Sequence, residues 1–424
     1  MRVNRDAALL IRRLVLIILM TYQTGCAQPI AVRIVDQDGN VAFCRAGNTF
    51  RARGAAGPGS IELLAESGAN ATRTWSSSES TGEMLDAASA LGLSVCLGIK
   101  FTKVNDGFDY EDAEQCAEHL ESVRTTVMRY RDHPAVLVWG LGNEMELGAP
   151  DRDEVWDHVE RAAALVKSLD ADHPTMTVIA EIGGTKVAEI HERCPSIDII
   201  GINSYRGAAS LPLRYRDAGG TKPFLVTEFG TNAPYEAQQT EWGMPIESSS
   251  TEKAAQYRRA YDSLRTAPNC LGAFAFVWGH KEQGSRTWHG MFLEDGSTLQ
   301  AVDEMTLAWG GVLWNRSPRI SSFYTTGPTL LRQGEHITAT VVASDPDGDK
   351  LSFEYILVGE LPNALGGNTT GDPPGEYSSQ NLQPEGSSVT LTAPRIEGPL
   401  RLYVIVRDRE GSAATASIPL CIEP

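Results

Sequence analysis

The chain has 424 residues, with 37 Lys and Arg against 54 Asp and Glu, which gives a formal net charge of −17 at pH 7. Affinity for nucleic acid depends on Lys and Arg side chains that neutralise phosphates, so this balance argues against a nucleic acid partner. Charged residues make up 21% of the chain and hydrophobic residues 42%, values typical of a globular protein. The length suits one large barrel with an additional domain.

The first 27 residues have the pattern of a secretory signal. Four arginines precede a short apolar run, and small residues follow it. The run is too short to span a bilayer, so we expect no transmembrane helix in the mature chain. Gly25-Cys26 resembles a bacterial lipoprotein site, where Cys26 would carry a lipid anchor, and cleavage after Ala27 is the alternative. We therefore expect an exported protein in the periplasm, at the cell surface or outside the cell.

Apolar strand patterns then alternate regularly with amphipathic helix patterns. The predicted strands end or lie near 51–54, 69–75, 93–101, 135–142, 175–180, 197–203, 223–229 and 271–278, and a predicted helix follows each. Eight such units predict a (β/α)8 barrel. A doubly wound parallel sheet is the alternative, although that fold does not need eight units.

The pattern changes at Pro318, where short alternating strands replace the helices. These strands, at 336–344, 351–358, 388–393 and 400–407, predict a small all-β sandwich of the immunoglobulin or cadherin type. The expected domains are a signal peptide at 1–27, a barrel at 28–316 and an accessory sandwich at 317–424. The turn at 344–349 has closely spaced carboxylates that suit Ca²⁺, but its sequence is also a good turn without a metal. Its potential ligands are Asp345, Asp347 and Asp349.

The strongest functional signal is a pair of glutamates at predicted strand ends. Glu144 ends the fourth strand in Trp139-Gly-Leu-Gly-Asn-Glu144, and Glu228 ends the seventh in Val226-Thr-Glu228. Catalytic groups of such barrels stand at the carboxyl ends of the strands. Two carboxylates at this rim are what cleavage of a glycosidic bond requires.

Polar and aromatic side chains near other strand ends predict a sugar site, because polar groups orient hydroxyls and aromatic faces pack on sugar rings. The expected carbohydrate-binding residues are Arg73, Trp75, Asn143, Asn203, Tyr205 and Trp278, with His280, Trp242 and Trp288 on the long loops after strands seven and eight.

Several of these segments resemble clan A glycoside hydrolases, especially family 2, the β-galactosidase and β-glucuronidase group. The likeness lies in Arg131-Asp-His-Pro through Asn143-Glu144, and in Thr227-Glu-Phe-Gly230. It implies a retaining mechanism that requires no cofactor, with Glu144 as acid/base and Glu228 as nucleophile. It further implies that Asn143 holds the substrate 2-hydroxyl.

The same resemblance implies positions for three more residues. Arg73 and Tyr205 would keep Glu228 ionised and correctly oriented, and Trp278 would form the floor of the sugar subsite. There is also some likeness to family 5 and to β-1,3-glucanosyltransferases, and the segment 278–281 fits no pattern closely. A β-glucan transglycosylase that uses the same pair is therefore an alternative, and a non-catalytic surface carbohydrate-binding barrel is a third.

Overall fold

The computed structural model describes residues 30–149, 153–360 and 375–423. The expected signal segment, including Cys26 and Ala27, lies outside these residues. Within them, no helix combines the length and the apolar composition needed to cross a bilayer. The six cysteines in the described ranges are all free thiols, and Cys96 is buried in a barrel strand, as expected.

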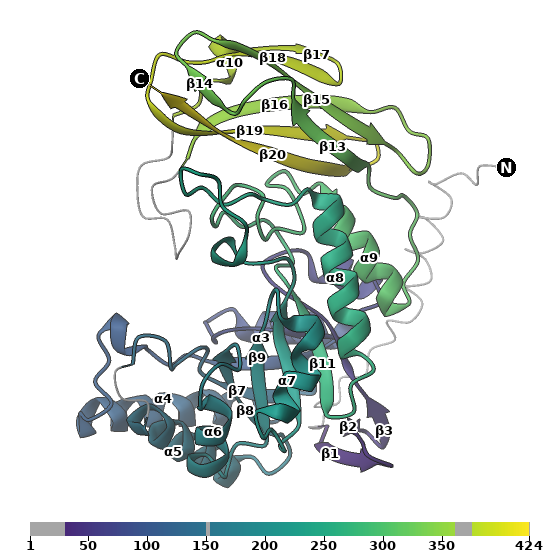
Figure 1. Ribbon diagram of the computed structural model, residues 1–424. Coiled ribbons are helices and arrows are strands. Elements are labelled where there is room, and N and C mark those ends of the chain that lie inside the picture. Colours follow the sequence, from purple (N-terminus) through teal and green to yellow (C-terminus); the bar gives the residue numbers. More distant parts are fainter. Residues whose placement is uncertain (1–29, 150–152, 361–374, 424) are drawn as a thin grey trace, which may run out of the picture.

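Eight parallel strands close into a barrel, which confirms the predicted fold class (Figure 1). Around the barrel the strands are β10 (Phe224–Phe229), β11 (Cys270–Phe276), β4 (Ala52–Ala56), β5 (Ala71–Arg73), β6 (Ser94–Ile99), β7 (Val136–Leu141), β8 (Thr175–Ala180) and β9 (Ile199–Asn203). In chain order the helices that follow β4 to β11 are α2 (Ile61–Glu66), α3 (Thr81–Ala90), α4 (Ala113–Tyr130), α5 (Asp153–Leu169), α6 (Lys186–Arg193), α7 (Leu211–Asp217), α8 (Ser250–Leu264) and α9 (Gln300–Trp309).

The barrel strands are apolar along their whole length because helices cover one face and the barrel interior covers the other. All six residues of β7 are buried, for example. Helices α2, α4 and α8 begin at side-chain caps. At the start of α8, the Ser249 hydroxyl accepts a hydrogen bond from Glu252 N while the Glu252 side chain accepts one from Ser249 N. This reciprocal cap satisfies backbone donors that the helix leaves unpaired.

A small antiparallel sheet covers the amino end of the barrel. It consists of β1 (Val32–Gln37), β2 (Asn40–Arg45) and β3 (Asn48–Phe50). The turn at 36–39 joins β1 to β2, and Gly39 N donates to Asp36 Oδ1 over 2.7 Å. Val32 N donates to Asp172 O, just before β8, and the fully buried Phe43 joins the hydrophobic cluster inside the barrel. The sheet therefore closes the end opposite the predicted site.

The C-terminal region is the predicted β-sandwich of two sheets. One sheet contains β13 (Arg319–Thr325), β15 (His336–Ser344), β18 (Ser388–Thr392) and β17 (Leu382–Glu385). The other contains β12 (Thr298–Leu299), β20 (Ser412–Glu423), β19 (Gly398–Arg407), β16 (Ser352–Gly359) and β14 (Leu330–Arg332), and the one-turn helix α10 (Ser378–Asn381) precedes β17. Sequence reasoning missed β20, whose first half is rich in alanine, a residue depleted in strands. Pairing with β19 along ten residues holds it in the sheet.

The sandwich packs on the long loops and helices of the barrel and lies over the ends of α8 and α9 (Figure 1). Strand β12 belongs to the loop after β11, yet it pairs with β20 of the sandwich. Two hydrogen bonds tie the start of α8 to the sandwich: Thr415 N donates to Ser250 Oγ over 2.9 Å, and Ile320 N donates to Thr251 Oγ1 over 3.0 Å. The two parts thus share a sheet and a buried contact surface.

Candidate active site

A sharp turn after β7 places Asn143 and Glu144 at the carboxyl rim. Gly142 has φ +77° and Glu144 has φ +55°, both in the left-handed region. A Cβ at Gly142 would lie 2.6 Å from Met145 Cγ, so only glycine fits this position. Glu144 N donates to Val178 O of β8 over 2.7 Å, which fixes the turned backbone against the next strand.

Glu228 lies inside β10, is 5% exposed, and accepts three side-chain hydrogen bonds. Arg73 Nη1 lies 3.0 Å from Oε1, Trp75 Nε1 lies 2.7 Å from Oε1, and the Tyr205 hydroxyl lies 2.6 Å from Oε2. A carboxylate accepts hydrogen bonds on both oxygens, and bonds to an ionised acceptor are the stronger kind. These donors therefore occupy both oxygens of Glu228 and fix the direction of its side chain.

Glu144 has different surroundings. Asn203 Nδ2 donates to its Oε1 over 2.8 Å, and Lys103 Nζ lies 3.8 Å from its Oε2. Burial raises the pKa of Glu144, and the nearby charge of Glu228 raises it further. A buried carboxyl group beside a second carboxylate holds its proton at higher pH than a free one. Glu144 is thus suited to donate a proton.

Asn143 joins the two glutamates into one hydrogen-bond network. Its Oδ1 accepts from Arg73 Nη2 over 2.6 Å and from Asn203 Nδ2 over 3.2 Å. The Asn203 amide is fixed in turn by Thr227 Oγ1, which donates to Asn203 Oδ1 over 2.7 Å. The structure therefore brings together seven of the residues selected from the sequence: Arg73, Trp75, Asn143, Glu144, Asn203, Tyr205 and Glu228.

Trp278 does not lie in this site, which corrects the expectation that it floors a sugar subsite. Its side chain is 1% exposed, packs on Phe292 and Trp309, and donates to Ser60 O over 2.9 Å. Phe276, two residues earlier, faces the site instead, because its ring centre lies 6.0 Å from that of Trp75 and 5.8 Å from that of Tyr205. The peptide bond between Phe276 and Val277 is cis.

The three loop residues have separate environments. Trp288 is 2% exposed and donates to Asn232 O over 2.6 Å, so it supports the loop after β10 and has no open ring face for a sugar. This corrects its assignment to substrate binding. Trp242 is half-buried at the tip of the 238–246 hairpin, and the partly exposed His280 lies 3.9 Å from Glu282 Oε1. Within the described residues, no hydrogen bond connects Trp242 or His280 to the network of the two glutamates.

Sequence reasoning missed Lys281, which lies close to the two glutamates. Its Nζ is 4.7 Å from the centre of the Phe276 ring. Burial lowers the pKa of Lys281, while the charges of Glu228 and Glu144 act against that shift. Lys103, whose Nζ lies 3.8 Å from Glu144 Oε2, was missed as well. Neither lysine stands on a strand, so no periodic pattern marked them.

The acidic turn of the sandwich does not gather metal ligands. Asp347 accepts from Arg316 N over 2.7 Å and from Arg316 Nη2 over 2.8 Å. Asp345 Oδ1 accepts from the backbone N of Asp347 and of Asp349, as in an ordinary turn. In the part of the chain that the structure describes, no three carboxylate, His or Cys side chains converge as a metal site. Asp345 Oδ2 is buried and has no hydrogen-bond partner within the described residues, so the Ca²⁺ alternative stays a prediction.

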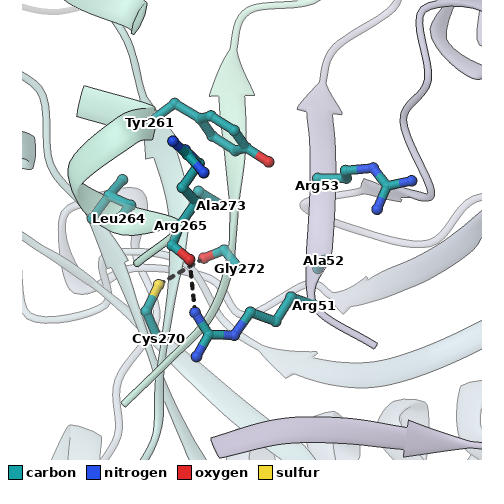
Figure 2. Close-up of a pocket in the computed structure, with 9 residues that line it drawn as sticks. All are labelled: Arg51, Ala52, Arg53, Tyr261, Leu264, Arg265, Cys270, Gly272 and Ala273. Carbon is teal, nitrogen blue, oxygen red and sulfur yellow. Dashed lines mark hydrogen bonds between the residues drawn. The ribbon is translucent and has the colours of Figure 1, made fainter. Parts of the chain in front are cut away.

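A small cavity lies at the other end of the barrel, between the last turn of α8 and the first residues of β4 and β11 (Figure 2). Arg51 Nη1 donates to Arg265 O there over 2.8 Å, and Arg53 Nε donates to Gly68 O over 3.0 Å. Because Glu144 and Glu228 stand at the carboxyl ends of the strands, this cavity is separate from the catalytic rim.

The closed barrel carries one glutamate with three hydrogen bonds on its seventh strand, and a second glutamate, of raised pKa, after its fourth strand. This is the arrangement of clan A glycoside hydrolases. Residues 60–237 match the family described as "Glycosyl hydrolases family 2, TIM barrel domain". The match covers barrel strands β5 to β10 and supports a family 2 glycoside hydrolase.

Relatives agree with this assignment. The chain is 27% identical over 206 residues to a "Beta-glucuronidase" of Paenibacillus borealis, covering 43% of this chain and 33% of the relative. It is 24% identical over 186 residues to a "Probable mannan endo-1,4-beta-mannosidase A" of Aspergillus clavatus, covering 38% of this chain and 51% of the relative. The chain thus spans about half or less of the length of these relatives.

A solved structure shows the same fold. The β-D-glucuronidase of Dictyoglomus thermophilum aligns with 67% of this chain and 54% of its own, with a TM-score of 0.51 and 18% sequence identity.

Proposed function

We propose that the protein is an exported retaining β-glycosidase that acts on β-linked oligo- or polysaccharides. The observation that carries this proposal is the contrast between the two glutamates. Glu228 accepts three hydrogen bonds, one of them from an arginine, whereas burial and a neighbouring carboxylate raise the pKa of Glu144. A nucleophile must be ionised and an acid must be protonated, so the two environments support opposite functions. Export rests on the sequence pattern of residues 1–27, which is typical of a secretory signal.

In the first step, a Glu228 oxygen bonds to the anomeric carbon while the bond from that carbon to the leaving oxygen breaks. Glu144 transfers its proton to the leaving oxygen. In the second step, Glu144 as a carboxylate takes a proton from water, and the resulting hydroxyl displaces Glu228 from the anomeric carbon. The two inversions return the original configuration and regenerate both side chains.

The side-chain NH2 group of Asn143 supports this mechanism. Asn143 Oδ1 is occupied by Arg73 and Asn203. Among the described residues its Nδ2 has no hydrogen-bond partner, so these two hydrogens are available to donate to a substrate hydroxyl. A donor to the 2-hydroxyl next to the anomeric carbon stabilises the transition state.

Substitution of each glutamate tests the assignment. Glu228→Gln should abolish turnover of activated aryl β-glycosides, and azide should restore it with inversion of configuration. Glu144→Gln should retain turnover of substrates whose leaving groups need no proton and lose it for others. Glu121→Gln on the surface of α4 is the matched control and should behave as wild type. Undiminished activity in Glu228→Gln would reject the proposed nucleophile.

We propose further that the substrate carries an acidic sugar. The Lys281 ammonium is close to both glutamates, and within the described residues it makes no hydrogen bond or ion pair. A partly buried, unpaired cation in a binding site favours an anionic ligand group. The relative from Paenibacillus borealis is a β-glucuronidase, and a glucuronide supplies a carboxylate.

Turnover of aryl β-glucuronides can be compared with turnover of neutral β-glucosides and β-mannosides. The comparison shows which of the two relatives better indicates the substrate of this protein. We expect kcat/KM to be highest on the glucuronide, and Lys281→Met to lower it there by about tenfold to a hundredfold, the worth of a hydrogen bond to a charged group. The same variant should change turnover of neutral glycosides much less. Preferential turnover of the β-mannoside by wild type would instead support a mannosidase.

A further inference from the structure

The residue that follows β8 has a strained backbone at the catalytic rim. Glu181 has φ +59°, in the left-handed region, as Glu144 has with φ +55°. This conformation strains an L-residue other than glycine, and such residues cluster at functional sites. The contacts of the Glu181 carboxylate indicate which function this strain serves.

Both oxygens of the Glu181 carboxylate accept hydrogen bonds. Arg214 Nη1 of α7 donates to Oε1 over 2.9 Å, and the backbone N of Ile182 donates to the same oxygen over 2.9 Å. The Ser204 hydroxyl donates to Oε2 over 2.6 Å, and Arg214 Nη2 lies 3.2 Å from that oxygen. Burial alone would raise the pKa of Glu181, but the hydrogen bonds from Arg214 and Ser204 outweigh burial, and the pKa is lowered. Glu181 is therefore an ionised acceptor, which binds a hydroxyl more strongly than a neutral one does.

Ser204 is the middle residue of a segment that contacts both catalytic glutamates. Asn203 Nδ2 donates to Glu144 Oε1 over 2.8 Å. The Tyr205 hydroxyl donates to Glu228 Oε2 over 2.6 Å. Ser204 N also donates to Glu228 O over 2.9 Å, while its own hydroxyl binds the carboxylate described above. A group that holds the Ser204 hydroxyl therefore holds the segment that orients both glutamates.

The ion pair between Glu181 and Arg214 is attached to this segment at two further points. Glu181 N donates to Asn203 O over 2.9 Å, and Arg214 Nη2 donates to Gly207 O over 2.8 Å. A Cβ at Gly207 would lie 2.2 Å from Arg214 Nη2 and 2.9 Å from Glu181 Oε2, so a larger residue there would displace the ion pair. The backbone before and after Ser204 is thus fixed to the same two side chains.

This ion pair is too exposed to act mainly as a stabiliser of the fold. The side chains of Arg214 and Glu181 are 35% and 38% exposed. Ion pairs in such surroundings contribute little to stability, because water screens the charges. Ser204, in contrast, is 1% exposed and lies between two residues of the catalytic network. Loss of the Glu181 carboxylate should therefore change the geometry of the site more than the stability of the barrel.

We propose that Glu181 is a positioning residue for the catalytic pair. Held by Arg214, its carboxylate anchors Ser204 and so determines where the neighbouring side chains meet the two glutamates. This inference rests on the proposed function. Misplacement of a catalytic group by about 1 Å can lower a rate about a hundredfold, so a small shift of this segment slows the reaction. In this function Glu181 acts through Ser204 and does not touch the substrate.

The test is a double-mutant cycle between Glu181 and Ser204, measured by steady-state kinetics on the preferred aryl glycoside. Glu181→Ala and Ser204→Ala should each lower kcat by about tenfold or more, the scale of one hydrogen bond to a charged group, while KM changes by less than about twofold. The double variant should lose little more activity than the weaker of the two single variants, because both substitutions remove the same hydrogen bond.

Glu181→Gly separates the effect of the carboxylate from the effect of backbone strain. Glycine adopts φ +59° without strain, so this variant should have a higher urea midpoint than Glu181→Ala and the same low kcat. Asp262→Ala is the matched control, because the Asp262 side chain is also 38% exposed and is paired with Arg258 and Arg265. It should leave kcat and KM unchanged.

Several results would overturn the positioning function and leave the proposed function intact. One is a double variant in which the two losses multiply, and another is a Glu181→Ala variant in which KM rises while kcat stays constant. Full activity of Ser204→Ala is a third. Recovery of kcat in Glu181→Gly would likewise contradict it, since strain would then be the cause of the loss. A wild-type protein that turns over no aryl glycoside would overturn both proposals.

Discussion

Neutralising Glu228 should lower the pKa of Glu144, because the Glu228 charge is one of the two main causes that raise it, after burial. In Glu228→Gln the negative neighbour is gone, so Glu144 loses its proton at lower pH. Carbon-13 NMR titration of the side-chain carboxyl groups in the two proteins measures this shift. An unchanged or increased pKa of Glu144 in the variant would show that the two carboxyl groups are not coupled.

Removing the Tyr205 hydroxyl should impair catalysis with little change in fold. The hydroxyl donates to Glu228 Oε2 over 2.6 Å, and a hydrogen bond to a charged group contributes about 1.5–3 kcal/mol. Tyr205→Phe should therefore lower kcat by roughly ten- to a hundredfold, while KM changes less. Steady-state kinetics on the preferred aryl glycoside measure both constants. Tyr324→Phe in the sandwich is the control, and equal effects of the two variants would contradict a specific contact with Glu228.

Residues on strands were more predictable than residues on loops. Arg73, Asn203 and Glu228 end buried strands, so the period of two and the parallel topology decide where their side chains lie. Trp278 lies just beyond its strand, and its ring packs on Phe292 and Trp309. The directions of Lys281 and Lys103 depend on the conformations of loops, which no periodicity encodes.

Helices α4 and α5 meet through a histidine pair, of which His158 is fully buried, and we expect it to make the fold sensitive to acid. His119 Nδ1 lies 2.8 Å from His158 Nε2, and the rings of Phe101, Phe108 and Tyr110 surround His158. Burial lowers the pKa of His158 from 6.5 to about 3, and the charges of His119 and Arg161 add to the effect. The folded state therefore holds His158 neutral in conditions where the unfolded chain would bind a proton.

The stability of the folded state should therefore fall as the pH is lowered. Above pH 6.5 both states carry neutral His158, and its contribution to stability is fully present. Between pH 6.5 and about 3 only the unfolded state binds the proton, so stability falls by about 1.4 kcal/mol per pH unit.

Urea unfolding at pH 7 and pH 5 should show a loss of about 2 kcal/mol from this site. His158→Phe should remove that part of the slope and the exposed His336→Phe should keep it; identical slopes in the two variants would exclude His158 as the cause.

Across the whole molecule, buried charges connect the barrel to the sandwich. Arg401 of β19 is fully buried, is paired with Glu360, and lies 4.0 Å from Glu247 in the loop after β10. Glu247 also accepts from Lys253 Nζ and, over 2.7 Å, from Thr287 Oγ1 in the loop after β11. Both loops flank the catalytic rim, so the sandwich helps to position them.

Arg401→Met should destabilise barrel and sandwich together by about 3–5 kcal/mol, because it leaves the buried carboxylate Glu360 without its cation and takes from Glu247 one of its two neighbouring cations. All eight tryptophans lie at or before Trp314, so tryptophan fluorescence reports on the barrel side. Its urea midpoint should fall in the variant. Arg407→Met on the same strand removes a partly exposed pair with Asp295 and should cost at most about 1 kcal/mol. A barrel midpoint that does not move in Arg401→Met would show that the two parts unfold independently.

Covalent trapping tests the central claim most directly. A 2-deoxy-2-fluoro glycoside with a reactive leaving group slows the second step more than the first, so the glycosyl-enzyme intermediate accumulates. With the fluoro analogue of the preferred substrate, peptide mass spectrometry should find one sugar on Glu228 in wild type and none in Glu228→Gln. A label on another residue, or products of inverted configuration in wild type, would contradict the retaining mechanism.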